Sequence, residues 1–169
     1  MPSLKHLHRL PMGLLVVAAG WIPITTFAQP DVGSSGEDAA VVGAVLAANA
    51  DMVAAANRMD LDAFFGAMIE ADRTMIVQNG AIFQTRAEAR VSVERGLRGI
   101  ARVDRRFDNP QVTVISPETA LLVSEGSVTA TLNDGREMIG RFAVSLIFVL
   151  RDGQWKLLHG HYSTPMAQD

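Results

Sequence analysis

Cysteine is absent from the 169 residues of the chain, and aromatic residues make up only 6%. Without thiols the protein cannot form disulfides, thiolate zinc sites or iron–sulfur clusters, and it has no cysteine nucleophile. The composition is otherwise ordinary for a globular protein, with 49% hydrophobic and 20% charged residues. The length predicts one domain, and no cofactor is predicted.

Outside the start of the chain, no apolar run is predicted to be long enough to span a bilayer. Lys5 and Arg9 occur there without an acid, and an apolar run from Leu14 to Ala19 follows. The tripeptide Thr26-Phe27-Ala28 ends in the small residue that a signal-peptide cleavage site needs. We therefore predict a signal peptide over residues 1–28 and, in a bacterium, a periplasmic or secreted protein that has no membrane contact after cleavage. An uncleaved membrane anchor is the alternative.

The remaining chain is predicted to consist of a flexible leader over residues 29–38, rich in Gly, Ser and Pro, and one domain over residues 39–166. Apolar spacing and capping residues predict three helices, over residues 37–57, from Asp60 to Met68, and after the capping box Thr85-x-x-Glu88.

Alternating apolar residues and turn signals predict that strands make up the rest of the domain. Asn79-Gly80 is a hairpin turn signal, and the even positions of the segment 121–132 are apolar or small, so they form its core face. Strands are predicted at residues 73–77, 81–84, 103–107, 112–115, 121–132, 138–150 and 155–162. Because helices come first and a long antiparallel meander follows, the fold class is α+β.

The last strand carries a more specific pattern. Residues 151–163 contain Asp152-Gly153-x-Trp155 followed by His159, His161 and Ser163. This ending resembles the nuclear transport factor 2-like (NTF2-like) superfamily, including the SnoaL-like proteins and the association domain of calcium/calmodulin-dependent protein kinase II. Residues 60–80 are similar to the opening of that superfamily, with Met59 where it usually has Gly. The resemblance covers residues 40–165 and implies a cone of three N-terminal helices packed on a curved antiparallel sheet.

The resemblance implies several kinds of function, because the superfamily includes polyketide cyclases, steroid isomerases, dehydratases, epoxide hydrolases and pure binding or assembly modules. We favour an exported protein that binds a small, mainly apolar organic molecule in the cone cavity. One alternative is a small lyase or isomerase, of the polyketide cyclase or ketosteroid isomerase type, that uses Asp72 and Tyr162. Another is a dimeric assembly module without a ligand.

Two glycines predict where a ligand cavity would lie. In the kinase association domain, the positions matching Gly126 and Tyr162 carry basic residues, and neither is basic here. Gly126 and Gly160 leave volume on what we take to be the inner face, beside the only tyrosine of the chain. The ligand pocket is therefore predicted to be lined by Ser124, Gly126, Leu158, Gly160 and Tyr162.

Asp72 and His161 are the candidate catalytic residues. A carboxyl group near an apolar cavity can act as a general base, although Asp72 can equally be a capping or ion-paired residue. His159 and His161 are two residues apart on one strand, where two imidazoles could serve acid–base chemistry, half of a metal site or a subunit interface. No third ligand accompanies them at a recognisable spacing, so no metal is predicted.

The same strand predicts a homodimer. Trp155, Leu157, His159 and His161 alternate along the strand, so they are predicted to share its outer face and to present apolar area to water. A second copy of the chain could cover that face.

A band of arginines is the remaining feature with a possible function. After removal of residues 1–28 the chain keeps 13 basic and 18 acidic residues, a net charge of −5. This charge, together with the lack of interleaved aromatic residues, argues against a nucleic-acid partner and for a solvated surface. The band consists of Arg86, Arg90, Arg95, Arg98, Arg102, Arg105 and Arg106.

Overall fold

The computed structural model describes residues 36–70 and 75–165. The predicted signal peptide, most of the leader and Asp72 lie outside the described residues. The first helix, α1, spans Gly36–Asn57. The last three residues of the predicted leader, 36–38, are therefore helical rather than part of a flexible segment.

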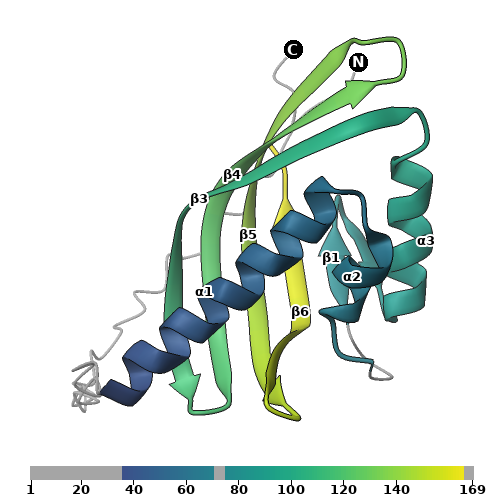
Figure 1. Cartoon of the computed structure of the whole chain (residues 1–169). Helices are drawn as coiled ribbons and strands as arrows, with labels where there is room; N and C mark the ends of the chain where they lie inside the picture. The colour runs from purple at the N-terminus through teal and green to yellow at the C-terminus, as the bar shows by residue number, and fades with distance from the viewer. Residues whose placement is uncertain (1–35, 71–74, 166–169) are drawn as a thin grey trace, which may run out of the picture. The chain divides into compact units, whose positions relative to one another are not determined.

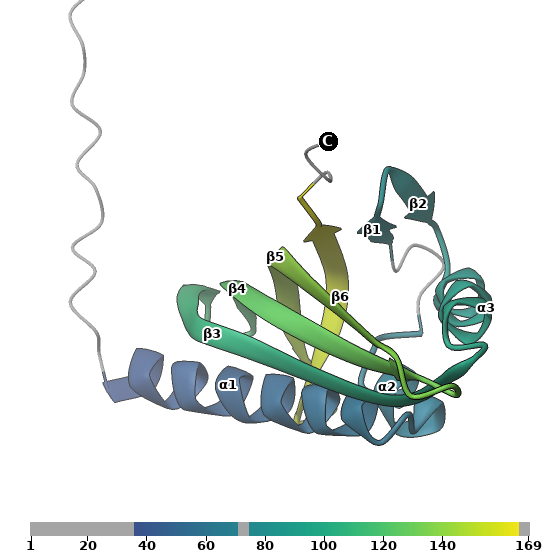
Figure 2. The same ribbon diagram turned by 90° about the horizontal axis from the view of Figure 1, so that it is seen from above.

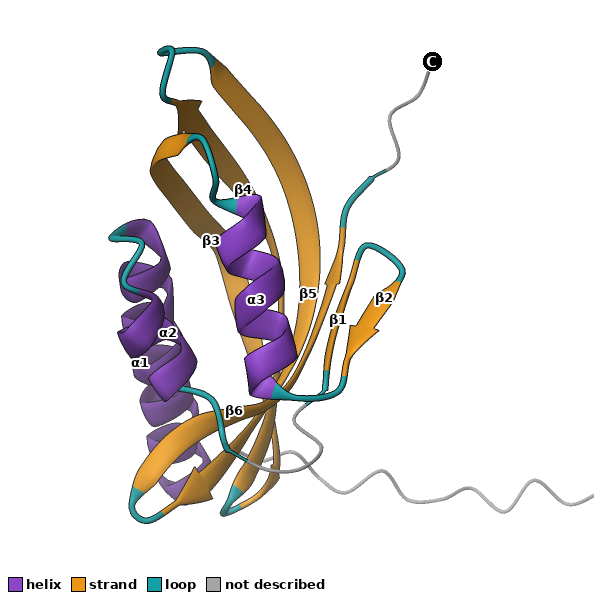
Figure 3. Cartoon of the chain, turned by 90° about the vertical axis from the view of Figure 1, so that its right-hand side faces the viewer, coloured by secondary structure: helices purple, strands orange, loops and turns teal. Residues whose placement is uncertain are grey.

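The described elements form one curved six-stranded sheet with three helices on one side (Figures 1 and 3). Their order after α1 is α2 (Leu61–Gly66), β1 (Ile76–Gln78), β2 (Ala81–Phe83), α3 (Arg86–Gly96), β3 (Ile100–Ser116), β4 (Thr119–Leu132), β5 (Glu137–Arg151) and β6 (Gln154–Ser163). The strand order in the sheet is β2-β1-β6-β5-β4-β3. All neighbours are antiparallel except β1 and β6, which run parallel. The predicted α+β class is confirmed.

Local capping explains where the helices begin. The Asp60 side chain accepts a hydrogen bond from the backbone N–H of Ala63 at 3.0 Å, and Thr85 Oγ1 accepts one from the N–H of Glu88 at 3.1 Å. Between these two helices, Asn79 and Gly80 have φ values of 52° and 76°, the positive values that a tight hairpin turn requires. The turn and caps read from the sequence are confirmed.

Met59 ends the long first helix in a left-handed conformation, with φ of 55°. A residue with a side chain adopts this conformation at a cost that glycine avoids. The glycine that the resemblance implies at this position would adopt the conformation without that cost.

The helix α1 lies diagonally across the sheet, as Figures 1 and 2 show. It is the one helix of the described residues that is long and apolar enough to span a membrane, a property that core helices and signal sequences share. Val45, Met52 and Ala55 are buried in the core with Leu122 and Leu146 of the sheet. One face of α1 therefore packs on the sheet, and export of the protein stays a prediction.

The alternation predicted for β4 is confirmed. Ala120, Leu122 and Ser124 are buried, whereas Val123 between them is 42% exposed. The even positions therefore face the helices and the odd positions form the outer face of the sheet.

The prediction of two separate strands around Asn109-Pro110 is wrong, because β3 runs unbroken through both residues. The pairing with β4 is irregular between Asp108 and Gln111, and Asn109 has φ of 48°. A bulge of this kind absorbs the proline. The proline also lies on an edge strand, where its missing N–H need not remove a hydrogen bond between strands.

A second bulge reverses the predicted faces of the first half of β6. His159 pairs with Ile147 and Leu157 pairs with Phe148, so Leu158 has no partner residue on β5. Leu157 is fully buried, and its backbone is bonded to Ala67 and Ile69 just after α2. The prediction that Leu157 shares the outer face with the two histidines is therefore wrong.

Candidate functional site

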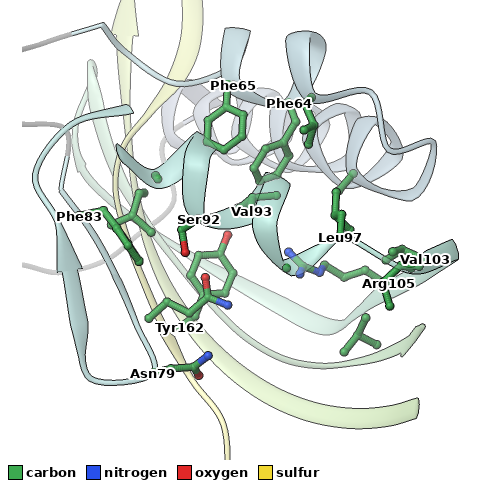
Figure 4. Close-up of a pocket in the computed structure, with 18 of the residues that line it drawn as sticks. Phe64, Phe65, Asn79, Phe83, Ser92, Val93, Leu97, Val103, Arg105 and Tyr162 are labelled. Atoms are coloured by element: carbon green, nitrogen blue, oxygen red, sulfur yellow. The ribbon is translucent and has the colours of Figure 1, made fainter. Parts of the chain in front are cut away.

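A pocket of about 500 Å³ lies between the helices α2 and α3, the β1–β2 hairpin and the inner face of the sheet (Figure 4). Aromatic and aliphatic side chains form most of its wall. They include Phe64 and Phe65 of α2, Phe83 of β2, Val93 of α3 and Val103 of β3. The exposed residues Asn79, Ala81, Gly96 and Met138 mark its mouth. Pockets of this size and character hold small organic molecules.

Few polar residues line this apolar wall. Among the described lining residues, Arg105 is the only charged one, and Gln78, Asn79, Ser92 and Tyr162 are the other polar ones. Figure 4 shows the side chains of Arg105, Ser92 and Tyr162 directed toward the same space. They come from β3, α3 and β6, three elements far apart in the sequence.

Arg105 is held in place by both its backbone and its side chain. Asn57, the last residue of α1, accepts a hydrogen bond from the Arg105 N–H at 2.7 Å and donates one to the Arg105 carbonyl at 3.0 Å. The guanidinium carbon lies 5.6 Å from the Phe142 ring centre and 5.9 Å from that of Tyr162, which is within cation–π range. The end of α1 and two aromatic rings thus fix the arginine in the pocket.

Tyr162 is the one predicted pocket residue that lines the pocket. Burial raises the pKa of its phenol, and the positive charge of Arg105 opposes this rise. At neutral pH the phenol keeps its proton, and its hydroxyl can donate a hydrogen bond into the pocket.

Because Tyr162 is the only tyrosine of the chain, its ionisation can be followed by absorbance at 295 nm. We expect a midpoint above the ordinary value of about 10. Since the folded-state pKa is higher than the unfolded one, the contribution of this group to stability is complete below about pH 10 and is lost as the pH rises through the folded pKa. Arg105→Met should move the midpoint higher still, whereas a wild-type midpoint at or below 10 would contradict a shift dominated by burial.

Gly126 does not provide cavity volume, so this prediction is wrong. A Cβ atom there would overlap the carbonyl oxygen of Arg106 and the ring of Phe142. The Phe142 ring, which packs edge-on against Phe107 at 5.4 Å, already fills the space. Gly126 is a glycine because the sheet and this ring approach closely.

The other three predicted pocket residues also lie outside the pocket lining. Gly160 is buried against Tyr162, Leu146 and Ile76, which a Cβ would meet at 3.2–3.4 Å. Ser124 Oγ lies 2.9 Å from the Asp108 carbonyl oxygen, so its hydroxyl supports the bulge of β3. Leu158 occupies the bulge of β6. These residues shape the sheet rather than the cavity.

The two histidines lie on the outer face of the sheet. His161 pairs with Ser145 and is exposed, while its neighbour Tyr162 lines the pocket on the opposite face. His161 is therefore not placed to act in this pocket, which corrects its prediction as a catalytic residue. Since Leu157 is in the core, the outer face is less apolar than the sequence indicated, and the homodimer stays a prediction.

Two further predictions concern a metal site and Asp72. Within residues 36–70 and 75–165, no three His, Asp or Glu side chains gather into a possible metal site. Asp72 lies outside the described residues, and in the sequence it precedes Ile76 and Gln78, both of which line the pocket.

Sequence reasoning missed Arg105, because it was grouped with the neighbouring arginines as part of a solvated band. Two members of that band fit the description, since Arg90 and Arg106 are ion-paired with Asp62 and Asp104 near the surface. A signal for Arg105 was present in the alternation of Val103, Arg105 and Phe107, which places the three on one face of the strand.

Comparisons with known proteins agree with this architecture. The SnoaL-like domain family matches residues 45–167. A protein assigned as a scytalone dehydratase from Novosphingobium aromaticivorans has a structure similar to this one, with a TM-score of 0.70 at 15% identity, covering 78% of this chain and 88% of that one. No protein of curated function matches the sequence.

Two further structures have the same fold. An NTF2-like superfamily protein from Salmonella enterica serovar Typhimurium gives a TM-score of 0.68 at 13% identity, covering 78% of this chain and 95% of that one. A hexachlorocyclohexane dehydrochlorinase gives 0.64 at 9% identity, covering 77% and 88%. Because the family match spans residues 45–167, most of the chain, the chain belongs to the SnoaL-like domain family, and it shares the fold of the NTF2-like structures.

Proposed function

We propose that this protein binds a small, mainly apolar organic molecule in the pocket between α3 and the inner face of the sheet. The observation that carries the proposal is the pocket itself, about 500 Å³ in volume, with an apolar wall and polar groups from three separate elements directed into it. Burying an apolar ligand against an apolar wall is favourable in free energy, and the few polar groups orient the ligand.

The family supports a small-molecule role without specifying one. Structures that share the fold include a protein assigned as a dehydratase and a dehydrochlorinase. Since one fold hosts many unrelated activities, the choice among binding and catalysis rests on the residues of this pocket.

Blocking the pocket from α3 tests the proposal. Ser92 is half-buried and its side chain points into the pocket (Figure 4). We expect Ser92→Phe to fill the space and abolish the thermal shift that small aromatic compounds produce in the wild-type protein. A ligand at 100 times its Kd stabilises the folded state by about 2.7 kcal/mol, which a thermal-shift assay resolves.

The matched control is Val91→Phe, at the preceding residue of the same helix. Val91 is 54% exposed and does not line the pocket. This variant should retain the thermal shifts of the wild type. Equal shifts in both variants would place the binding elsewhere, and a library without any active compound would remove the proposal.

A lyase or isomerase is the second candidate function. Tyr162 supports it, because a protonated phenol directed into the pocket can stabilise a developing negative charge on a substrate oxygen. Asp72 would be the general base. Chromatography of each bound compound after incubation with the protein distinguishes catalysis from binding. A compound that the wild type consumes and Asp72→Asn only binds indicates catalysis. A compound that the wild type leaves unchanged indicates binding alone.

A further inference from the structure

Arg105 places a positive charge in a mainly apolar pocket. Two arginines of α3, by contrast, are paired with carboxylates, Arg86 with Glu70 at 2.8 Å and Arg90 with Asp62 at 2.7 Å. Within the described part of the chain, Arg105 has no carboxylate partner, and its Nε atom is buried without a hydrogen-bond partner. A buried polar nitrogen of a charged group costs free energy when it has no partner, because its hydrogen bond to water is lost and not replaced.

Contacts from α1, β5 and β6 hold the Arg105 side chain and backbone in position. The Asn57 side chain makes hydrogen bonds to both the N–H and the carbonyl of Arg105, and the Phe142 and Tyr162 rings lie against the guanidinium. An arginine that only needed solvation would extend into water, as the neighbouring Arg106 does with 73% of its side chain exposed.

We propose that the ligand of this pocket is an organic monoanion, a carboxylate on an apolar body, whose carboxylate group is bound by Arg105. This inference rests on the proposed function, because it specifies the chemistry of the molecule that occupies the pocket. The guanidinium presents parallel N–H donors that match the two oxygens of a carboxylate. The hydroxyls of Tyr162 and Ser92 are directed toward the same space from facing walls of the pocket and can donate to the same group (Figure 4).

The charge of the pocket selects a monoanion over a dianion. Arg105 is the only charged residue among the described lining residues. A phosphate dianion would leave one negative charge without compensation against an apolar wall, which is unfavourable. A carboxylate is neutralised by the single guanidinium.

Three probes that share one ring system and differ in the head group test this inference by isothermal titration calorimetry. The probes are 2-naphthylacetate, its neutral primary amide and 2-(2-naphthyl)ethylammonium. We expect the acid to bind the wild-type protein about tenfold to a hundredfold more tightly than the amide, as a hydrogen bond to a charged group implies. The ammonium should bind more weakly than the amide.

Variants of the arginine identify the group responsible. Arg105→Met should reduce the affinity for the acid to that for the amide and leave the amide within about threefold of wild type. Arg105→Lys, which keeps the charge with a different geometry, should retain a preference for the acid. Arg106→Met is the matched control, because Arg106 is the next residue, lies on the outer face and is ion-paired with Asp104.

The outcomes distinguish failure of the carboxylate ligand from failure of ligand binding in the pocket. If the acid and the amide bind equally, or if Arg105→Met leaves the affinity for the acid unchanged, the anionic ligand is wrong while binding in the pocket stands. If none of the probes binds and the compound library of the Ser92→Phe experiment is also inactive, both the inference and the proposed function fail.

Discussion

Gly126→Leu is expected to prevent the protein from folding to its native state. Even the Cβ atom of alanine would overlap the carbonyl oxygen of Arg106, a backbone atom that cannot rotate away, and the ring of Phe142. Gly126→Ala should therefore cost about 2 kcal/mol or more of the free energy of unfolding, and the larger leucine side chain more than that. Chemical denaturation monitored by circular dichroism measures both.

The matched control for this prediction is Gly140→Ala on the neighbouring strand. A Cβ there would meet only Val128 Cγ1, at the ordinary contact distance of 3.5 Å. This variant should be neutral or more stable by about 0.4–1 kcal/mol, since alanine restricts the unfolded chain. Equal stability of the two alanine variants would mean that the Phe142 ring does not occupy the space over Gly126.

Leu157→Ala is expected to destabilise the protein by about 2–5 kcal/mol, the range for removing a fully buried leucine side chain. Leu157 is 0% exposed and lies in the core with Phe148 and Met68. Leu158→Ala, at the half-buried bulge position, should cost less. Urea denaturation of the two variants gives their free energies of unfolding and shows whether β6 has the bulge at Leu158 or is regular. A larger loss for Leu158→Ala would place Leu158, rather than Leu157, in the core.

Local sequence patterns predicted the elements whose structure depends on neighbouring residues. Asp60, Thr85 and Asn79-Gly80 act within three or four positions, and the structure confirms each of them. The alternation along β4 was also sufficient, because this strand is paired on both sides and alternates between buried and more exposed positions from Thr119 to Gly126.

The errors arose where a distant segment decides the local conformation. An unbroken strand from Trp155 to His161 is consistent with the sequence, but the chain after α2 binds the backbone of Leu157 and shifts the register by one residue. One inserted residue moves the preceding side chains to the other face. The prediction of cavity volume at Gly126 failed for a related reason. The space over this glycine is filled by the ring of Phe142, a residue of another strand.

The candidate site was the least predictable part. Its wall is built from three helices, the β1–β2 hairpin and four further strands, so no single stretch of sequence contains it. Tyr162 was found because it is unique in the chain and faces inward. Arg105 was hidden among neighbours of the same charge, and its role depends on Asn57, which is 48 residues away in the sequence.

A crystal structure of the protein with 2-naphthylacetate tests the central claim most directly. The account predicts the naphthyl ring between α3 and the inner face of the sheet, beside Phe83 and Val93, with a carboxylate oxygen at hydrogen-bond distance, about 3 Å, from the Arg105 guanidinium. A complex in which the ring lies outside this pocket while the pocket remains empty would contradict the account.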